Sequence, residues 1–320
     1  MVSRQSGSRP DATIVIVDRD EPQLTLESVR SILSQQGASF EVLVVSTSES
    51  ACAGQPASDL ADVRVIPPLA GADPLAGACA GIVAATGRAI VLLDNRTRLR
   101  AGALAALLAP LAEPRVGAVI PLRLLQATDP VIVSSTGAEV TRSGDRRDRD
   151  WGLPLEDLER PAGPAMAFSS AAVALRREAV ADVGGWFDPA RFSYYEDIEL
   201  AFRLRRRGWE IRYAPNSVVQ HRLAPAPWEG STARLASYET DRLRFAIVHG
   251  TPGVSFRRVG RTFAGAWFLL LRGDASGFGR RLRSLGQALR DVVGLRGRRR
   301  ELMRSATVPL SAVWSDGPTN

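Results

Sequence analysis

Two tyrosines followed by two acids, residues 194–197, combine the residue types that a general base requires. Aromatic surface limits solvent around a carboxylate and lets its pKa rise toward the working pH, which suits Glu196 or Asp197 to proton transfer. The simpler interpretation is that both acids only complement the dipole of the helix that they begin. Further along this helix, we expect Glu199 and Arg203 to form an i,i+4 pair on the exposed side.

A second stretch ends an apolar run, residues 89–93, with Asp94, Asn95 and Arg96. A buried strand that stops on a carboxylate usually presents it to a ligand, although an ordinary polar turn is the alternative. Arg96 stands where a metal site would have a second acid, and a guanidinium cannot ligate a cation. This strand end therefore offers one acid and one positive charge.

The elements that must position these acids alternate between strands and helices from residue 12 onward. Continuous apolar runs are typical of parallel strands buried on both faces, and the helical patterns between them end at glycines. This rhythm predicts an α/β fold with a doubly wound, mostly parallel sheet. The expected strands are residues 12–17, 40–46, 89–93 and 116–121, and the expected helices lie within 23–37, 73–87 and 101–112.

Polar residues follow three of these strands, namely Asp18, Ser46 and Asp94. In open sheets of this kind, ligands bind beyond the carboxyl ends of the strands. We therefore take all three as candidate ligand-binding residues, with a plain turn residue as the alternative for each.

Residues 176–221 resemble the central block of the family-2 glycosyltransferases. Three elements carry the resemblance: the Gly-Gly-Trp-Phe-Asp turn at 184–188, the tyrosine-acid stretch, and the histidine that ends Ser-Val-Val-Gln-His. Weaker similarity extends it to roughly residues 12–252. The subgroup that it resembles most includes rhamnosyltransferase-like enzymes of bacterial cell-envelope polysaccharides.

The resemblance implies a GT-A fold and inverting transfer of a sugar from a nucleoside-diphosphate sugar to a glycan or lipid-linked acceptor hydroxyl. It implies that Asp197 deprotonates the acceptor, with Glu196 beside it, and that His221 helps Asp94 to hold a divalent metal, Mg²⁺ or Mn²⁺. The implied acceptor-binding residues are Gly184, Gly185, Asp188 and Tyr195. The implied nucleotide-sugar-binding residues are Asp18, Ser46, Asp94, Asn95 and Arg96.

Two positions depart from the family pattern. Ser46 stands where the family usually has an aspartate that contacts the base, and Arg96 replaces the second acid of the Asp-x-Asp metal motif. Three accounts follow. Arg96 neutralises the diphosphate directly by bidentate hydrogen bonds; or metal still binds through Asp94 and His221 with fewer protein ligands; or the chain is a non-catalytic relative that binds a sugar nucleotide or glycan, or serves as a membrane-associated partner subunit.

The expected organisation has four parts. A flexible N-terminus, 1–11, precedes a GT-A domain, 12–230, with a nucleotide-sugar half, 12–100, and an acceptor half, 101–230. Basic amphipathic helices, 231–304, and an unpatterned tail, 305–320, complete the chain. Within the acceptor half, the polar composition of residues 122–163 predicts a long loop or a small excursion.

All 41 basic residues are arginines, and the formal net charge is +7. Residues 251–304 hold 13 of these arginines against three acids, interleaved with apolar residues. This pattern predicts docking of the C-terminal helices on an anionic membrane surface. Packing on the core is the alternative, and nucleic acid is disfavoured because no nucleic-acid-binding motif accompanies the charges.

The two cysteines, Cys52 and Cys79, show neither CxxC spacing nor disulfide density, and no apolar run reaches the roughly 20 residues that span a bilayer. We therefore expect a cytoplasmic protein, peripheral on the inner face of the cell membrane.

Overall fold

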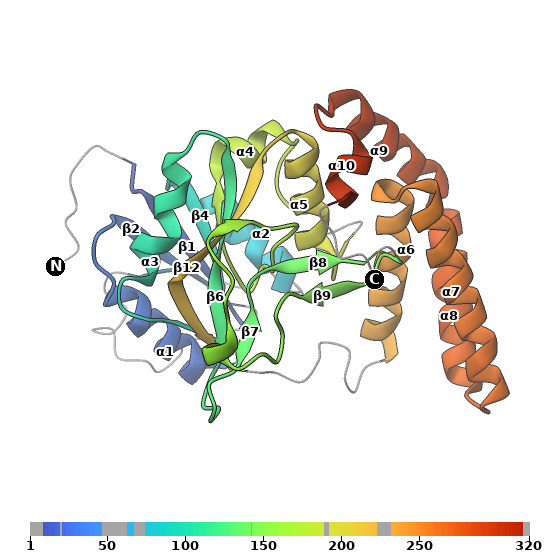
Figure 1. Cartoon of the computed structure of the whole chain (residues 1–320), viewed down its shortest axis with the longest axis horizontal. Coiled ribbons are helices and arrows are strands. Elements are labelled where there is room, and N and C mark those ends of the chain that lie inside the picture. The colour runs from blue at the N-terminus through green and yellow to red at the C-terminus, as the bar shows by residue number, and fades with distance from the viewer. Residues whose placement is uncertain are drawn as a thin grey trace. The chain divides into compact units, whose positions relative to one another are not determined.

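The computed structural model describes residues 9–19, 21–46, 63–66, 74–141, 143–188, 192–222 and 232–315. Most of the expected N-terminal segment, the end of the expected tail, and Cys52 lie outside these ranges. The chain divides into two compact units, and most of their elements are labelled in Figure 1. Unit 1 comprises residues 1–138, 148–186 and 209–223, and unit 2 comprises residues 139–147, 187–208 and 224–320.

The strands are short to medium in length. They are β1 (Ala12–Asp18), β2 (Phe40–Ser46), β3 (Val63–Ile66), β4 (Ala89–Asp94), β5 (Thr97–Leu99), β6 (Val116–Leu125), β7 (Val133–Ser135), β8 (Ala138–Val140), β9 (Arg146–Asp148), β10 (Gly163–Pro164), β11 (Ala172–Arg176) and β12 (Glu210–His221).

The helices of unit 1 are shorter than most of those of unit 2. Unit 1 contains α1 (Pro22–Leu33), α2 (Pro74–Ala84), α3 (Ala103–Leu108) and α4 (Arg177–Asp182). Unit 2 contains α5 (Glu196–Arg206), α6 (Thr232–His249), α7 (Pro252–Leu271), α8 (Ala275–Arg290), α9 (Val292–Ser305) and α10 (Leu310–Ser315).

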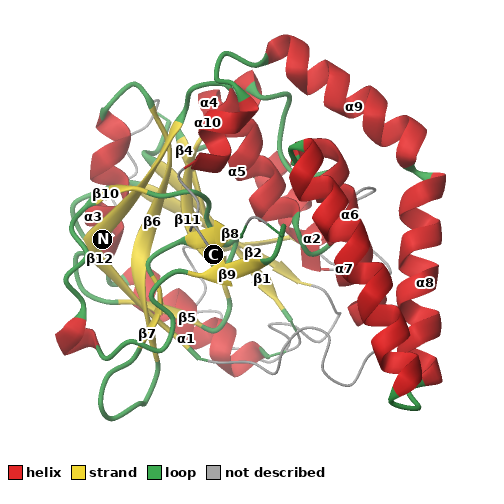
Figure 2. Ribbon diagram, turned by 45° about the vertical axis from the view of Figure 1, so that its right-hand side comes forward, coloured by secondary structure: helices red, strands yellow, loops and turns green. Residues whose placement is uncertain are grey.

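In the described part of unit 1, ten strands form one mixed, mostly parallel sheet, seen in yellow in Figure 2. Its main order is β10-β12-β6-β11-β4-β1-β2-β3, with β5 beside β12 and β7 beside β6. β1 pairs in parallel with β2 and β4, and β12 pairs in parallel with β6, whereas β11 runs antiparallel between β4 and β6. The α/β fold class expected from the apolar runs is confirmed.

Helices cover both faces of this sheet. The side chains of α1 and α3 share one core cluster with Ile14 and Ile16 of β1. α2 packs on the opposite face, where a Cβ on Gly81 would lie 2.4 Å from Val15 Cγ1 and 2.8 Å from Val45 Cγ2. Only glycine lets α2 approach so closely, and the sheet is therefore doubly wound, as the alternating pattern predicts.

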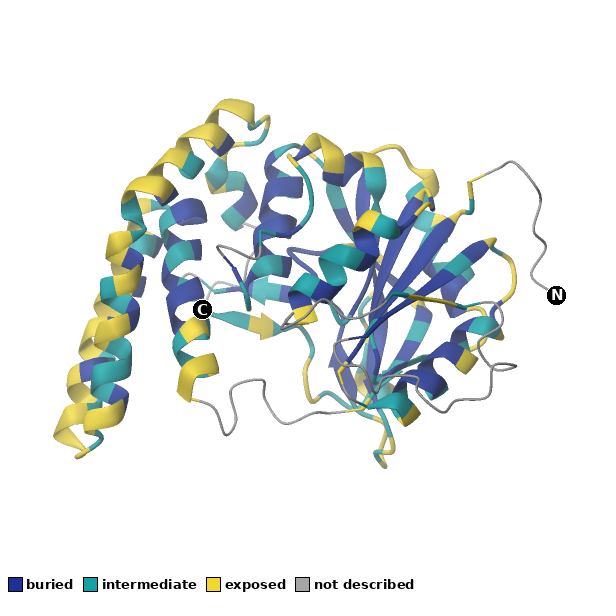
Figure 3. Ribbon diagram, turned by 180° about the vertical axis from the view of Figure 1, so that it is seen from behind, coloured by how far each residue is buried: buried dark blue, intermediate teal, exposed yellow. Residues whose placement is uncertain are grey.

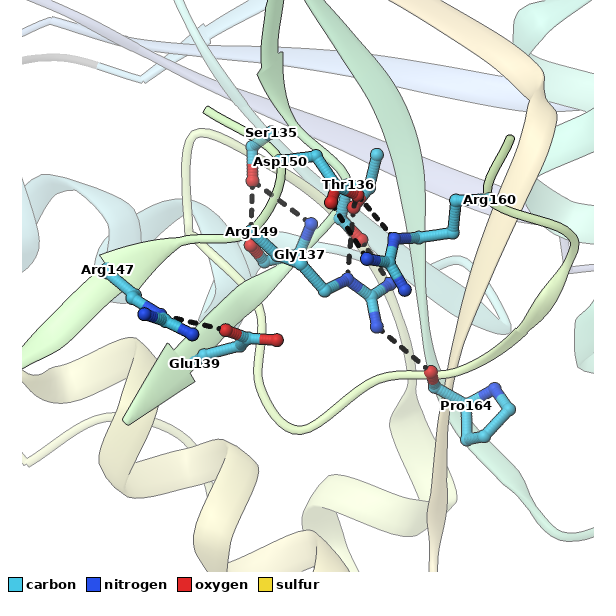
Figure 4. Close-up of polar contacts among 9 residues, drawn as sticks. All are labelled: Ser135, Thr136, Gly137, Glu139, Arg147, Arg149, Asp150, Arg160 and Pro164. Carbon is cyan, nitrogen blue, oxygen red and sulfur yellow. Dashed lines mark hydrogen bonds and ion pairs between the residues drawn. The ribbon is translucent and has the colours of Figure 1, made fainter. Parts of the chain in front are cut away.

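The region 122–163, expected as a loop, is more regular than its composition suggests. It contains the end of β6, all of β7, β8 and β9, and a short 3₁₀ turn at Leu155–Asp157. A polar network stabilises its unit 1 part (Figure 4). Thr136 Oγ1 donates to Asp150 Oδ2 at 2.5 Å, Arg160 forms a bidentate ion pair with the same carboxylate, and Arg149 Nη2 donates to Thr136 O at 2.7 Å. These charge-assisted bonds tie the segments of this excursion together.

Unit 2 is mainly helical, and α6 to α9 occupy most of the stretch 231–304 that the sequence marked as basic. The stretch expected as an unpatterned tail forms α10, and its Trp314 joins an aromatic cluster with Phe202, Phe245 and His249. In Figure 3, α7 and α8 are largely exposed. Across the parts of the chain that the structure describes, no helix combines the length and the apolar content that crossing a membrane requires.

Candidate functional site

The sheet of unit 1 gathers candidate residues at one edge, which we call the strand-edge site (Asp18, Ser46, Asp94 and His221). Asp18 pairs in register with Ser46, and Val17 pairs with Asp94, so the three strands end together. His221 is the last residue of β12. The structure thus brings the residues expected at strand ends to one place, while their contacts with a nucleotide sugar stay a prediction.

Asp18 is the structural anchor of this edge. Its Oδ1 atom accepts hydrogen bonds from the Glu21 amide at 3.1 Å, from Thr25 Oγ1 at 2.8 Å and from Asn95 Nδ2 at 3.4 Å. Asn95 Nδ2 also lies 3.2 Å from Thr25 Oγ1, and all three side chains are buried. These bonds tie the ends of β1 and β4 to the start of α1, and the role of Thr25 carried no signal in the sequence.

Arg96 does not stand as a free cation in the site. Its Nε and Nη2 atoms donate to the two oxygens of Glu21 at 2.6 and 2.7 Å, and this hydrogen bonding raises the pKa of Arg96. Its backbone amide donates to Asp94 Oδ1 at 2.9 Å, and Arg19 Nη2 lies 3.5 Å from Asp94 Oδ2. Glu21 therefore neutralises the charge that the sequence placed at the metal-motif position.

Asp94 and His221 have the separation of two ligands of one metal ion. His221 Nε2 lies 4.0 Å from Asp94 Oδ1. Ligand distances of about 2.1 Å place two ligands of one ion about 3 to 4 Å apart. Burial, with the nearby Arg123 charge, lowers the pKa of His221 to about 4, so the ring is in the neutral form that binds metals.

Within the described residues, no group of three or more histidines, cysteines, aspartates or glutamates is placed to hold a metal ion. The pair Asp94 and His221 offers two ligands, and Mg²⁺-type ions commonly complete their shell with substrate phosphates and water. Asp94 and His221 would therefore supply two ligands of such a cation and leave the rest of its shell to other groups.

Unit 2 carries the second group, the α5 site (Glu196, Asp197 and Arg146). Asp197 lies in the first turn of α5 and is buried, and its Oδ1 accepts from the Ile198 amide at 2.8 Å. Its Oδ2 lies 3.8 Å from Arg146 Nη2. Glu196 precedes it and is half-buried. Arg146 comes from an arginine-rich run, and nothing in its sequence context singled it out.

Tyr195 supports this site from within. Its hydroxyl donates to Gly144 O at 3.2 Å and accepts from the Arg146 amide at 3.1 Å. The side chain is fully buried, and burial raises its pKa well above the usual value. In this structure the buried Tyr195 ring holds the turn at Gly144 through its hydroxyl, and the expected contact between Tyr195 and an acceptor stays a prediction.

Asp241 of α6 fixes the turn that leads into α5. Its Oδ2 accepts from the amides of Ser193 at 2.7 Å and Tyr194 at 3.0 Å. The side chain is buried, and this burial raises the pKa of Asp241. Sequence reasoning missed this residue, because its partners are backbone amides almost 50 positions earlier.

The pair Glu199–Arg203, expected on the exposed side of α5, is buried. Glu199 Oε2 accepts from Arg203 Nε at 2.8 Å, and its Oε1 lies 3.3 Å from His249 Nε2. Burial alone would raise the pKa of Glu199, but Arg203 and His249 outweigh it and lower the pKa to about 2. The expectation was wrong because α6 covers this face of α5 with His249.

The glycine turn is divided between the units. Gly184 and Gly185, in unit 1, have φ values of +86° and +102°, which only glycine adopts easily, and their amides cap α4. Asp188, in unit 2, accepts from the Phe192 amide through its backbone oxygen at 2.9 Å. The role of these three residues in acceptor binding stays a prediction.

Comparison with known proteins adds a family and a fold. A family model described as "Glycosyltransferase like family 2" matches residues 10–246. A pre-mycofactocin glycosyltransferase of Mycobacterium tuberculosis is 31% identical over 191 residues, which cover 55% of this chain and 38% of that protein. An N-acetylglucosaminyl-diphospho-decaprenol L-rhamnosyltransferase of the same species is 37% identical over 84 residues, 26% of each chain. This chain thus spans well under two thirds of either relative.

Two solved structures share the fold at low sequence identity. GalNAc-T7, solved with UDP, GalNAc and Mn²⁺, has a TM-score of 0.63 and 16% identity, over 81% of this chain and 52% of that one. The mannosyltransferase PcManGT from Pyrobaculum calidifontis, solved with GDP-Man and Mn²⁺, has a TM-score of 0.56 and 17% identity, over 97% and 79%. Both likenesses support the GT-A type of sheet.

Proposed function

The chain belongs to the glycosyltransferase-like family 2, and on that premise we propose that it is an active, inverting glycosyltransferase. It moves a sugar from a nucleoside-diphosphate sugar to a hydroxyl of a glycan or lipid-linked acceptor in cell-envelope synthesis. The observation that carries the proposal is the buried carboxylate of Asp197, 3.8 Å from the Arg146 guanidinium. This carboxylate is the group that would accept the proton of the acceptor hydroxyl.

In this reaction Asp197 takes the proton from the acceptor hydroxyl while the hydroxyl oxygen attacks the anomeric carbon. The bond from that carbon to the diphosphate breaks, and the diphosphate leaves with its electron pair on the opposite side. Glu196 lies beside Asp197 and would orient the acceptor. Attack opposite the leaving group inverts the configuration of the anomeric carbon.

At the strand-edge site, Asp94 and His221 are the residues that would hold a divalent cation. When bound, such a cation would supply positive charge to offset the charge on the departing diphosphate. The pairing of Arg96 with Glu21 favours this account over direct neutralisation by Arg96, because that guanidinium already has a carboxylate partner. The two solved neighbours carry Mn²⁺ with their nucleotides, which supports the same choice.

The second candidate is a non-catalytic protein that binds a sugar nucleotide or glycan. The presence of Arg96 at the second position of the metal motif favours it. Release of nucleotide from a panel of UDP-, GDP- and dTDP-sugars separates the two candidates, since only the enzyme turns a donor over with a suitable acceptor. Binding of a donor without turnover by any combination would support the second candidate.

We expect metal removal to stop the reaction. EDTA should abolish transfer and Mn²⁺ should restore it, because Asp94 and His221 alone leave the diphosphate charge unneutralised. Asp94→Asn should weaken Mn²⁺ binding by about 10- to 100-fold or more, measured by calorimetry with UDP present. Asp157→Asn, which changes an exposed acid of the same unit, is the control. Full turnover in EDTA would contradict metal dependence and would favour neutralisation of the diphosphate by Arg96.

We further propose that α7 docks on an anionic membrane surface. Phe256, Phe263, Trp267 and Leu271 recur every four or seven residues and are exposed, Phe256 by 81% and Leu271 by 84%. Arginines flank them on α7 and α8. An apolar stripe with cationic neighbours is the pattern of an interfacial helix.

The matching prediction concerns liposomes. The chain should co-sediment with phosphatidylglycerol vesicles more than with phosphatidylcholine vesicles, and less as salt rises. The double change Phe263→Ser with Trp267→Ser should weaken this binding by tenfold or more, because burying each such ring is worth about 1.5–3 kcal/mol. Trp151→Ser, at another exposed aromatic side chain, is the control. Equal binding by both variants would contradict the docking of α7.

A further inference from the structure

Four arginines from three helices of unit 2 form a cluster, which we call the arginine cluster. Burial first, and then the charges of its neighbours, lower the pKa of Arg242 to about 9. Such mutual effects require guanidinium groups that lie close together in a partly dry environment. The members are Arg242 of α6, Arg258 and Arg261 of α7, and Arg281 of α8.

The cluster has fewer carboxylates than guanidinium groups. Arg242 and Arg258 both pair with the same oxygen of Asp145, Oδ1, the latter at 2.6 Å. Arg281 pairs with Glu239 at 3.2 Å, and Glu239 is shared with a further arginine, Arg280. Among the residues that the structure describes, these ion pairs join two carboxylates to four guanidinium groups, and the guanidinium of Arg261 lies close enough to Arg242 and Arg258 to act on both.

Donor groups inside the cluster also lack acceptors. Among the described residues, the Nε atoms of Arg242 and Arg258 are buried and have no hydrogen-bond partner. Arg258 itself is only 6% exposed. Buried N–H donors are nearly always satisfied in folded proteins, and an unsatisfied charged donor is costly. The excess of positive charge and the unsatisfied N–H donors together indicate that the arginine cluster binds an anion.

The cluster lies beside the predicted base. Asp145, the carboxylate shared by Arg242 and Arg258, immediately precedes Arg146, whose guanidinium approaches Asp197. On the other side, the Tyr238 ring contacts both the Arg242 guanidinium, at 5.3 Å, and the Tyr195 ring, at 5.6 Å. A ligand bound by these arginines would therefore lie close to Asp197.

We propose that the arginine cluster binds a phosphate or diphosphate group on the acceptor, and so holds the acceptor hydroxyl at Asp197. Guanidinium forks match phosphate oxygens in pairs, and the surplus of positive charge suits a diphosphate. The proposal rests on the proposed transferase function and names the acceptor class, an alcohol that carries a phosphate or diphosphate. The diphosphate of the donor has the same chemistry, but the cluster belongs to the unit of Asp197 and not to that of the strand-edge site.

Binding without turnover tests the proposal. Farnesyl diphosphate serves as the acceptor-type probe in EDTA, inorganic diphosphate as the bare anion, and UDP with Mn²⁺ as the donor-type probe, each measured by calorimetry. Arg242→Gln and Arg281→Gln should each weaken farnesyl diphosphate and inorganic diphosphate binding at least about tenfold, the effect of losing one charge-assisted bond. UDP binding should not change. Arg283→Gln, on the same helix but exposed, is the matched control.

A second variant avoids any loss of folding. A Cβ on Gly265 of α7 would lie 1.7 Å from Arg281 Nη1, the mobile end of a side chain. Gly265→Ala should push this guanidinium aside while it favours the helix, since alanine has a higher helix propensity than glycine. We expect farnesyl diphosphate binding to fall as in Arg281→Gln, with an unchanged or higher Tm.

Other results of these binding experiments would overturn either the acceptor site or the proposed function. Cluster variants that bind farnesyl diphosphate like the unchanged chain overturn the acceptor site, and so do variants that lose UDP binding instead, since the cluster would then serve the donor. A chain that binds farnesyl diphosphate through the cluster but never turns over a donor overturns the proposed function and leaves the anion site standing.

Discussion

Asp197→Asn is expected to lower kcat for sugar transfer by about 10²- to 10⁴-fold, the usual contribution of a positioned general base. Asparagine matches the carboxylate in shape but has no lone pair basic enough to take the acceptor proton. Donor binding should persist, because the strand-edge residues of unit 1 are untouched. Nucleotide release with a saturating acceptor measures kcat, and calorimetry with the donor measures binding.

Two controls make this result specific. Glu196→Gln changes the neighbouring, half-buried acid and should reduce kcat far less, because Glu196 is assigned no proton transfer. Thermal unfolding of Asp197→Asn should stay close to that of the unchanged chain, so that lost activity is not lost folding. Full activity of Asp197→Asn would remove the base assignment, and equal losses in both variants would show that the charge of the pair matters, not one base.

The position of the strand-edge residues could be predicted from the sequence, because it depends only on where each strand ends. Apolar runs marked the parallel strands, and parallel strands end at the same edge of a sheet, so Asp18, Ser46 and Asp94 had to meet. The partner of Arg96 could not be predicted in this way. Glu21 reaches it from a segment 75 positions earlier, and only the packed sheet brings the two together.

The α5 site shows the same limit more strongly. The acids at the start of α5 stood out by type and spacing, but the groups that hold them are distant in sequence. Asp241 binds the turn from α6 and Arg146 approaches from the end of a hairpin. Single polar residues such as these form no periodic pattern, so nothing in one sequence indicates which backbone amide or carboxylate they will contact.

Burial of charge is the hardest property to predict, and Glu199 provides the sharpest test of it. Glu199→Ala is expected to destabilise the chain by about 3–5 kcal/mol, because it removes the carboxylate that pairs with the buried Arg203 guanidinium. His249, fully buried, also loses its contact with the carboxylate. Urea unfolding followed by circular dichroism measures the change. Glu301→Ala removes an exposed acid that pairs with Arg298 on α9, and should cost less than about 1 kcal/mol.

The pH dependence of stability separates the ionised pair from simple packing. The folded-state pKa of Glu199 is about 2, below its ordinary value of 4.5, so its contribution is complete above about pH 4.5 and disappears as the pH falls toward 2. The stability difference between Glu199→Ala and the unchanged chain should therefore shrink over that range. Glu199→Gln keeps the shape of the side chain and should show most of the loss at neutral pH. A difference that stays constant from pH 7 to pH 3 would mean that the volume of Glu199, and not its charge, stabilises α5 against α6.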